Sequence, residues 1–399
     1  MNTQNTPVHI RLWHRDFWLM AMANLLLTLA IYVLIPVMPG WLMQTENLTM
    51  QETGMVMGAF GIGIFIFGSL TSWLIQRFRR NMACIFAILL MAAMLGWLYY
   101  LDLQKSQFFD FPILLVQRLA LGATFGVAQM ILSSTLIIDT CESFQRTEAN
   151  HSAAWFSRFA FSLGPLTGIL VDRLAGFSTV LLVSIGCTVV AIIFILMVHF
   201  PFRSPEEHVR VVSLDRFFLP QGWPLTVNLL VVTFVMGLLL STITSELFFV
   251  MVMVGFLLAL LAQRFVFRDA DLESEVITGL LLIGVALLMM LTRHQTIVSF
   301  AAPMFVGFGL GIIGSRFLLF FIKLSRHCQR GTAQSTFFLA WESGLALGIG
   351  FGYGLLEQQM ESVLQVSLAT TIVALLFYHF SVRRHTVADC VSWRVLQPF

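Results

Sequence analysis

Residues 74–81 read Leu-Ile-Gln-Arg-Phe-Arg-Arg-Asn, and a near copy, Leu-Ala-Gln-Arg-Phe-Val-Phe-Arg, follows at residues 261–268. Each copy lies between two long apolar stretches, and the copies are about half the chain apart. A membrane chain made of two similar halves usually binds its ligand between them. The repeat therefore predicts two related halves, with Gln76, Arg77, Gln263 and Arg264 at corresponding places that take part in conformational change.

The composition is that of a membrane protein. Only 11% of the 399 residues are charged, 58% are hydrophobic, and the mean hydropathy is +0.86. A soluble domain has about 25% charged residues. The apolar residues form runs of about 20, the length that crosses about 30 Å of hydrocarbon as a helix. These features predict an all-α, multi-pass membrane protein.

Twelve spans can be placed along the chain, and the longest polar connection divides them six and six. That connection, with its flanking spans, predicts an N-terminal bundle over 1–203, a central loop over 204–222, and a C-terminal bundle over 223–399 that ends in a short tail. The expected spans are roughly 16–39, 52–75, 81–101, 110–137, 149–171, 177–200, 224–242, 246–263, 276–292, 296–322, 333–356 and 363–382.

The basic residues predict the orientation. With the N-terminus in the cytoplasm, 17 of the 23 Lys and Arg residues fall on the cytoplasmic side, and only Lys105, Arg173 and Arg293 fall outside. Cytoplasmic loops of membrane proteins carry such an excess of Lys and Arg. We therefore expect both termini in the cytoplasm. The short loops are typical of a bacterial protein, so we expect the cytoplasmic (inner) membrane of a bacterium. Topology explains the basic loops, so we expect no nucleic-acid partner.

A second repeat covers the entries to the fifth and eleventh spans. With one constant offset, Arg146 meets Arg330 and Asn150 meets Gln334. Further along, Gly164 and Gly168 meet Gly348 and Gly352, while Arg158 falls opposite Glu342. Duplicated halves predict this alignment. The glycines form small-residue faces that let membrane helices approach closely, and Pro165 between two of them weakens the helix and could act as a hinge.

Twelve spans, a central loop and two related halves resemble the major facilitator superfamily of secondary transporters. The resemblance covers essentially the whole chain and implies two pseudo-symmetric six-helix bundles. Three short signatures support it. Arg118-Leu-Ala-Leu-Gly122 is similar to the family's Arg-x-x-x-Gly, and Gly164-Pro165-Leu-Thr-Gly168 is similar to the Gly-Pro-x-x-Gly of its exporter branches. Span one ends in Leu34-Ile-Pro36-Val-Met-Pro39, which is also common among drug exporters.

The loop after span two departs from the family pattern. The family reads Gly-x-Leu-x-Asp-Arg-x-Gly-Arg-Arg, and this chain has Ser72, Gln76 and Arg79 where the pattern has Gly, Asp and Gly, while Arg77 and Arg80 fit. The resemblance implies that the aspartate anchors a charge network that latches the outward-open state. Gln76 forms hydrogen bonds but carries no charge, so the usual latch cannot be assumed.

Ionisable residues inside the spans are the first candidates for chemistry, because charge in the bilayer is costly unless it faces protein or water. Arg118 in span four is either an anion-binding or proton-coupling charge, or a structural arginine that binds carbonyls or extends outward. Arg158 in span five either meets an anionic substrate in the cavity or binds carbonyls at the inner end of the bundle.

Arg316 in span ten and Glu342 in span eleven are expected at similar depth, so an ion pair between them is plausible. Burial favours the neutral form of a carboxyl group, whereas a nearby arginine favours the charged form. One hypothesis is that Glu342 takes up a proton and releases Arg316 during transport. The other is a permanent structural pair that fixes helix packing.

Three polar side chains become possible substrate contacts by the resemblance, because spans one, four, seven and ten line the cavity in this superfamily. They are Asn24, Gln129 and Asn228. Polar pairs between helices are common for structural reasons as well.

The sequence therefore predicts a secondary transporter that works by alternating access, with no enzyme activity, cofactor or metal, and with a small molecule, protons and the lipid bilayer as partners of a monomer. The exporter-type Gly-Pro signature favours proton-coupled efflux of an amphipathic compound. One alternative is an uptake symporter or facilitator for a sugar, metabolite or organic anion. Another is a non-transporting sensor or assembly partner that retains the fold.

Overall fold

A computed structural model describes residues 11–104, 110–200, 210–267, 272–293, 295–326 and 329–382. The described chain consists of helices and connecting turns, with no β-strand among these residues. Residues 201–203 of the predicted N-terminal bundle, 204–209 of the predicted central loop, Arg268 of the first repeat and the predicted tail from residue 383 lie outside the described ranges.

The N-terminal helices give six spans. The first half comprises α1 (Arg15–Tyr32), α2 (Met38–Gln44), α3 (Met50–Ile66), α4 (Thr71–Arg77), α5 (Arg80–Leu103), α6 (Phe111–Ile131), the π-helical turn η2 (Leu132–Leu136), α7 (Ile137–Asp139), α8 (Arg146–Ala175) and α9 (Phe177–Leu196). Three short 3-10 turns are η1 (Gly68–Leu70), η3 (Ser143–Gln145) and, before α10, η4 (Pro220–Gly222).

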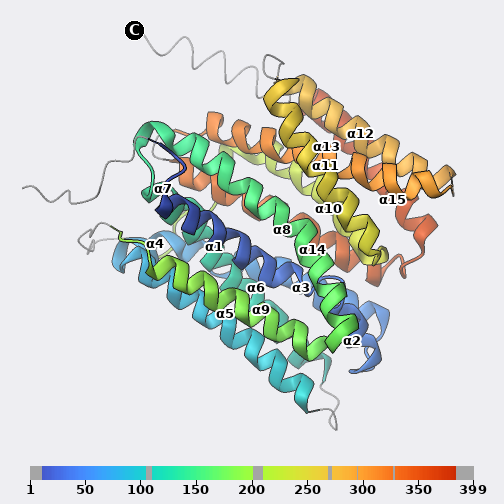
Figure 1. Cartoon of the computed structure of the whole chain (residues 1–399), viewed down its shortest axis with the longest axis horizontal. Helices are drawn as coiled ribbons and strands as arrows, with labels where there is room; N and C mark the ends of the chain where they lie inside the picture. Colours follow the sequence, from blue (N-terminus) through green and yellow to red (C-terminus); the bar gives the residue numbers. More distant parts are fainter. Residues whose placement is uncertain are drawn as a thin grey trace, which may run out of the picture.

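The C-terminal helices give the other six spans. They are α10 (Trp223–Thr242), α11 (Glu246–Phe265), α12 (Leu272–Thr292), α13 (Thr296–Leu324), α14 (Arg330–Gly354) and α15 (Met360–Phe377), which continues into the π-helical turn η6 (Tyr378–Val382). Figure 1 shows these yellow-to-red helices on one side of the molecule and the blue-to-green helices on the other.

Two helices differ from their neighbours in polarity. Ten helices of the described residues are long and apolar enough to cross a membrane. The other two long helices, α1 and α14, have 18 and 25 residues and lack a stretch that is apolar enough to be counted with the ten. Both contribute polar side chains to the centre of the bundle.

The first span is not one continuous helix. A helix was expected over 16–39, but α1 ends at Tyr32 and a short turn leads to α2. Pro36 and Pro39 fall in this region, and Pro39 lies in the first turn of α2. Proline has no backbone N–H and fits the first turn of a helix far better than its interior. The proline pair thus ends one helix and begins the next.

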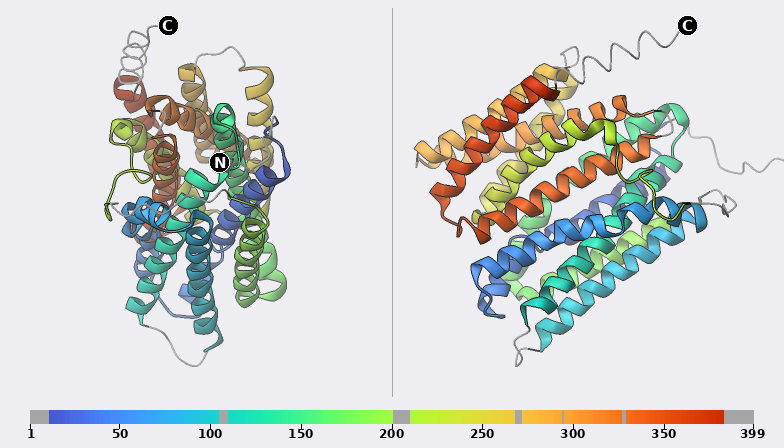
Figure 2. Two further views of the ribbon diagram at one scale, coloured as in Figure 1. Left: turned by 90° about the vertical axis from the view of Figure 1, so that its left-hand side faces the viewer. Right: turned by 180° about the vertical axis from the view of Figure 1, so that it is seen from behind.

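The packing confirms two related halves. In the first half α1 packs against α8 and α9, and α6 packs against α3 and α5. In the second half α10 packs against α14 and α15, and α13 packs against α11 and α12. Every one of these pairs has its counterpart in the other half. The two halves meet through α3 with α14, the blue and orange-red helices that lie side by side on the right of Figure 2, and through the equivalent pair α8 with α11.

Small residues allow the halves to approach closely. A Cβ atom placed on Gly54 would lie 2.6 Å from the carbonyl oxygen of Gly350, and one on Gly61 would lie 2.8 Å from Cβ of Ala346. On the same side of the molecule Arg173 of α8 forms a 2.6 Å salt bridge with Glu246 of α11. The halves therefore close against each other at the end opposite the basic loops.

Candidate functional site

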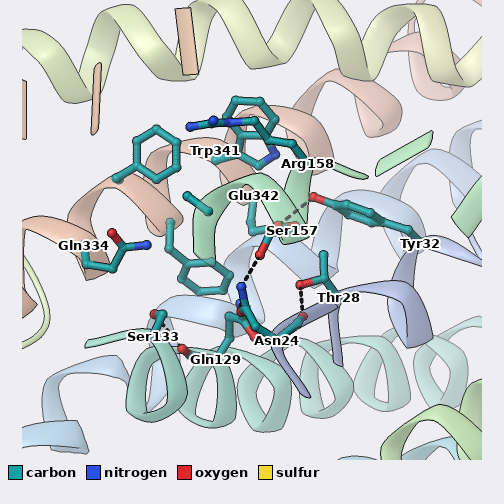
Figure 3. Close-up of a pocket in the computed structure, with 13 residues that line it drawn as sticks. Asn24, Thr28, Tyr32, Gln129, Ser133, Ser157, Arg158, Gln334, Trp341 and Glu342 are labelled. Carbon is teal, nitrogen blue, oxygen red and sulfur yellow. Dashed lines mark hydrogen bonds between the residues drawn. The ribbon is translucent and has the colours of Figure 1, made fainter. Parts of the chain in front are cut away.

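A small polar cavity of about 40 Å³ lies between the halves near the middle of the helices (Figure 3). A volume of this size holds a few water molecules. The side chains that line it come from α1, α6, η2 and α8 of the first half and from α14 of the second. They are Asn24, Thr28, Tyr32, Gln129, Ser133, Ala154, Ser157, Arg158, Gln334, Phe337, Phe338, Trp341 and Glu342.

Arg158 is a buried cation without a polar partner in the described part of the chain. Its side chain comes from the middle of α8 and is 3% exposed. None of its three guanidinium nitrogens forms a hydrogen bond with a described residue. The guanidinium carbon lies 4.7 Å from the ring centre of Trp155, and Figure 3 shows the side chain beside Trp341. Aromatic faces stabilise a cation only partly, because they supply no acceptor for its N–H groups.

Space for this guanidinium depends on a glycine of the second half. A Cβ atom on Gly314 of α13 would lie 2.9 Å from Nε of Arg158 and 3.0 Å from the ring of Trp341. The sequence therefore leaves room for an arginine at this depth instead of filling the space with an apolar side chain.

Glu342 forms a hydrogen bond across the two halves. The Tyr32 hydroxyl of α1 donates to Oε1 of Glu342 of α14 at 2.7 Å, and both side chains are buried. The tyrosine ring is fixed by an edge-to-face contact with Phe161. The bond closes the cavity on one side and ties a titratable carboxyl group to the opposite half of the molecule.

A second, smaller cavity of about 20 Å³ lies on the other side of this bond. Tyr32 and Glu342 line it together with Arg118 of α6, which is 2% exposed. Nε and Nη1 of Arg118 bond to no described residue, and its guanidinium carbon lies 4.8 Å from the ring centre of Phe60. Glu342 therefore separates two small cavities, each of which contains one arginine without a salt bridge to a described residue.

Amide side chains form the opposite wall of the first cavity. Asn24 donates to the Ser157 hydroxyl at 2.7 Å and to the carbonyl oxygen of Ala153 at 3.0 Å, and it accepts a hydrogen bond from Gln129. The side-chain oxygens of Gln129 and Gln334 have no partner among the described residues. The predicted contacts Asn24 and Gln129 thus line the cavity and leave acceptor capacity in it.

The predicted pair between Arg316 and Glu342 is wrong. Nε of Arg316 donates to Oε2 of Glu275 on α12 at 2.6 Å, and Glu342 bonds to Tyr32 instead. The prediction was based only on the depth of the two residues along their helices. The direction in which Arg316 points also depends on the rotation of α13 about its axis, and this rotation turns Arg316 toward α12 within its own half. The hypothesis that a proton on Glu342 releases Arg316 therefore has no geometric basis.

Asn228 also lies away from the cavity. Its amide donates to the backbone carbonyl of Ala374 on α15 at 2.8 Å, which is a contact within the C-terminal half. This is a structural bond between two helices, which was the alternative to a substrate contact for Asn228.

The signature glycines are packing positions. A Cβ on Gly122 would lie 2.3 Å from the carbonyl oxygen of Phe60, and Gly164 and Gly168 press against Tyr32 and the next residue, Val33. Pro165 lies inside α8, which runs unbroken through it. In the other half Gly348 and Gly352 press against Phe234, Gly237 and Ser241 of α10.

The two Gln-Arg-Phe copies end equivalent spans, the first at the end of α4, which completes the span that begins with α3, and the second at the end of α11. Gln76 donates its amide to the Ser72 hydroxyl at 3.2 Å, and Gln263 donates to the Ser315 hydroxyl. The first copy also contributes Arg80, which forms a salt bridge with Asp139 at the end of span four. Arg77 lies exposed in the last turn of α4, and the guanidinium carbon of Arg264 lies 5.9 Å from the ring centre of Phe265.

Tyr32 and Trp341 were not predicted from the sequence as residues of this site. A tyrosine at the end of an apolar helix carries no pattern that distinguishes it from a packing residue. Gln334 was noticed only as a repeat partner of Asn150, although its position two turns before Glu342 on one helix face could have placed it in the cavity.

Two helical bundles that meet around a central polar site are typical of secondary transporters. The chain matches the model of the Major Facilitator Superfamily over residues 20–349, and it belongs to this family of membrane transporters. The sequence search found no curated protein that matches it.

Solved structures share the fold across nearly the whole chain. The human organic anion transporter MFSD10 (TETRAN) superposes with a TM-score of 0.70 at 14% identity, over 91% of this chain and 98% of that one. A bacterial homologue of the human lysosomal transporter Spinster, inward-facing and unoccupied, gives 0.61 at 14% identity over 94% and 96%. The nucleoside transporter NupG gives 0.64 at 12% identity over 91% and 99%.

Proposed function

We propose that this transporter carries a small amphipathic organic anion together with a proton. The observation that supports the anion is Arg158, whose guanidinium lies buried in the central cavity without a hydrogen bond to a described residue. A buried cation is destabilised unless a counter-charge or hydrogen-bond acceptor reaches it. A carboxylate or sulfonate substrate supplies both, and a planar guanidinium binds such groups through two parallel hydrogen bonds.

The remainder of the cavity fits an amphipathic molecule. Trp341, Phe337 and Phe338 form an aromatic wall beside the guanidinium, and the amides of Gln129 and Gln334 lie on the other wall. Small-molecule sites combine an apolar lining with a few polar groups that fix orientation. In about 40 Å³ no such substrate fits, so we take the described conformation as occluded and expect the cavity to expand as the halves separate.

Glu342 is the proposed proton carrier. It lines the same cavity as Arg158 and the neighbouring cavity with Arg118. When Glu342 is ionised, its charge partly compensates these cations and repels an anion. When it is protonated, both cations remain uncompensated, and the anion binds more tightly. Because coupling between two ligands is reciprocal, the anion also favours the proton.

This linkage favours movement of proton and anion in the same direction, so an inward proton gradient would drive uptake. Proton-coupled efflux is the second candidate. Its support is the Gly164-Pro165-Leu-Thr-Gly168 signature, which packs directly against the end of α1 beside Tyr32. The likeness to a human organic anion transporter agrees with an anionic substrate in either direction.

Reconstitution into liposomes tests the proposal. A panel of fluorescent aromatic carboxylates and sulfonates, with neutral amides of the same carbon skeletons, is offered under a pH gradient of either sign. We expect accumulation of anions on the alkaline side and little flux of the amides. Flux of cations or neutral molecules only would contradict the anion site, and accumulation on the acidic side would favour the antiport that underlies efflux.

Arg158→Ala should abolish anion accumulation. The matched control is Arg15→Ala, which removes an exposed arginine in the first turn of α1, outside the residues that line the cavity. Retained accumulation in the Arg158 variant would overturn the assignment.

A further inference from the structure

The carboxylate of Asp215 connects the two halves at the end of the molecule that carries the basic loops, here called the basic end (residues 77–80, 139–146, 213–219 and 323–326). Oδ2 of Asp215 accepts a hydrogen bond from the Ser72 hydroxyl of α4 at 3.2 Å. Oδ1 accepts one from the Thr332 hydroxyl of α14 at 3.1 Å. Ser72 belongs to the N-terminal half and Thr332 to the C-terminal half, so one carboxylate binds both.

The connecting segment is held against the same elements by further bonds. The backbone N–H of Arg216 donates to Thr332 at 2.9 Å, and its guanidinium donates to Thr135 of η2 at 2.6 Å. The backbone N–H of Leu219 donates to Thr336 at 2.8 Å. These contacts span η2 and α14, which also touch directly where Gly331 meets Ser134.

Arg216 has an unusual backbone conformation. Its φ of 56° lies in the left-handed region, which a residue with a Cβ rarely adopts. Such a conformation persists only where surrounding contacts hold it. The contacts here reach both halves, so the segment is shaped to bridge them in this conformation.

The bridge also reaches Gln76, which stands where the loop signature of this family has aspartate. Gln76 donates to the Ser72 hydroxyl, and Ser72 donates to Asp215. A chain of hydrogen bonds thus runs from Gln76 through Ser72 to Asp215 and to Thr332. The negative charge that is missing at position 76 is present one hydrogen bond beyond Ser72, on the segment that joins the halves.

We propose that Asp215 is the latch carboxylate of this transporter. It holds the basic ends of the two halves together and takes over the charge that Gln76 cannot carry. Because Ser72 and Thr332 lie in different halves, they cannot both keep their bonds to Asp215 when the halves separate at this end. Opening of the central cavity toward the basic end therefore breaks the Asp215 bridge, whatever the substrate is.

Cysteine labelling tests this role on the purified full-length protein in detergent. The five native cysteines are replaced by serine, and Ser133→Cys, which lines the central cavity and is 4% exposed, serves as the reporter. Asp215→Asn keeps the size of the side chain but removes its charge. We expect this variant to raise the rate of maleimide labelling by about three- to tenfold, the effect of losing one or two hydrogen bonds from the closed state. Asp215→Glu should label at nearly the original rate.

Rescue distinguishes a latch from general loosening. Gln76→Asp, added to Asp215→Asn, places a carboxylate at the other end of the same chain and should slow labelling again. Glu148→Gln is the matched control, since Glu148 is an exposed acid on the same end of the molecule. Unchanged labelling in Asp215→Asn overturns the latch. If the double variant labels as fast as Asp215→Asn alone, the idea that Asp215 replaces the acid of position 76 is overturned.

A second variant tests the bridge in case Asp215→Asn folds poorly. Ser72→Ala removes the hydroxyl that donates to Oδ2 of Asp215 and leaves the bonds between the connecting segment and α14 in place. It should raise the labelling rate in the same direction, and slow labelling in this variant counts against the bridge.

Discussion

Helices α8 and α14 occupy equivalent places in the two halves but carry opposite chemistry. α8 packs on α1 through Gly164 and Gly168, and α14 packs on α10 through Gly348 and Gly352. Six residues before the first glycine of each pair, the first half has Arg158 and the second has Glu342. The scaffold is duplicated, whereas the central charge is not.

The difference shows which contacts a duplicated transporter must keep. Glycine faces set the distance between the helices of each half, and a side chain there would collide with backbone atoms. The residue types at the cavity positions can differ between the halves because these side chains face the cavity and not the backbone of an adjacent helix. One half then supplies the proposed anion site and the other the proposed proton site, and the Tyr32–Glu342 bond joins the halves between them.

The largest expected effect comes from removing the cation. Arg158→Ala should weaken anion binding by at least ~30-fold, from a loss of about 2–5 kcal/mol for a buried charged partner. The same change should raise the melting temperature of the substrate-free protein, because a buried charge without an acceptor is no longer present. Isothermal titration with an aromatic sulfonate and thermal unfolding measure the two effects.

The control for this prediction is the paired arginine. Arg316 forms its salt bridge with Glu275 inside the C-terminal half, so Arg316→Ala should lower stability and change anion affinity less than about threefold. If the two variants gave the same result, the distinction between an unpaired cation in the cavity and a paired one outside it would fail.

Removing the acid is expected to uncouple transport. Glu342→Gln keeps a hydrogen-bonding group for Tyr32 but takes up no proton. Anion affinity should become independent of pH and should equal the affinity of the original protein at low pH, where the carboxyl group is neutral. In liposomes, exchange of labelled for unlabelled anion should continue, while accumulation driven by a pH gradient should stop. Continued accumulation would show that another group carries the proton.

The glycine faces test the shared part of the comparison. A Cβ on Gly164 would lie 2.5 Å from Cβ of Tyr32, and one on Gly348 would lie 2.2 Å from the carbonyl oxygen of Phe234. Overpacking of this kind costs about 1–3 kcal/mol, so each alanine variant should lower the melting temperature by at least about 2 °C. Gly186→Ala, in the middle of α9 with no atom within 4 Å of the new Cβ, should leave the temperature unchanged or raise it.

The sequence was sufficient for the fold because the relevant signals are long. Apolar runs, the basic loops and two internal repeats each extend over many residues, and they agree with twelve spans in two halves. The site was only partly predictable. Arg118, Arg158 and Glu342 were found because charge in a membrane span is rare, and Asn24 and Gln129 followed from the family resemblance.

The pairing of these residues could not be predicted in the same way. Depth along a helix follows from counting residues, but rotation about the helix axis depends on the packing of all neighbours. This is why Arg316 was expected beside Glu342 and instead bonds Glu275 on α12. Asp215 lies in a connecting segment, where no periodicity indicates which helices it will reach.

The smallest expected effect concerns the second repeat, where Asn150 of α8 corresponds to Gln334 of α14. Both side chains have polar atoms without a partner among the described residues, but Gln334 lines the central cavity, whereas Asn150 is buried outside the residues that line it. Gln334→Ala should weaken anion binding by about two- to tenfold, the value of one hydrogen bond, and Asn150→Ala should leave it unchanged. Titration of both variants with the same sulfonate decides between them. Equal losses would mean that both halves contact the substrate at this level and that the asymmetry of the site is confined to Arg158 and Glu342.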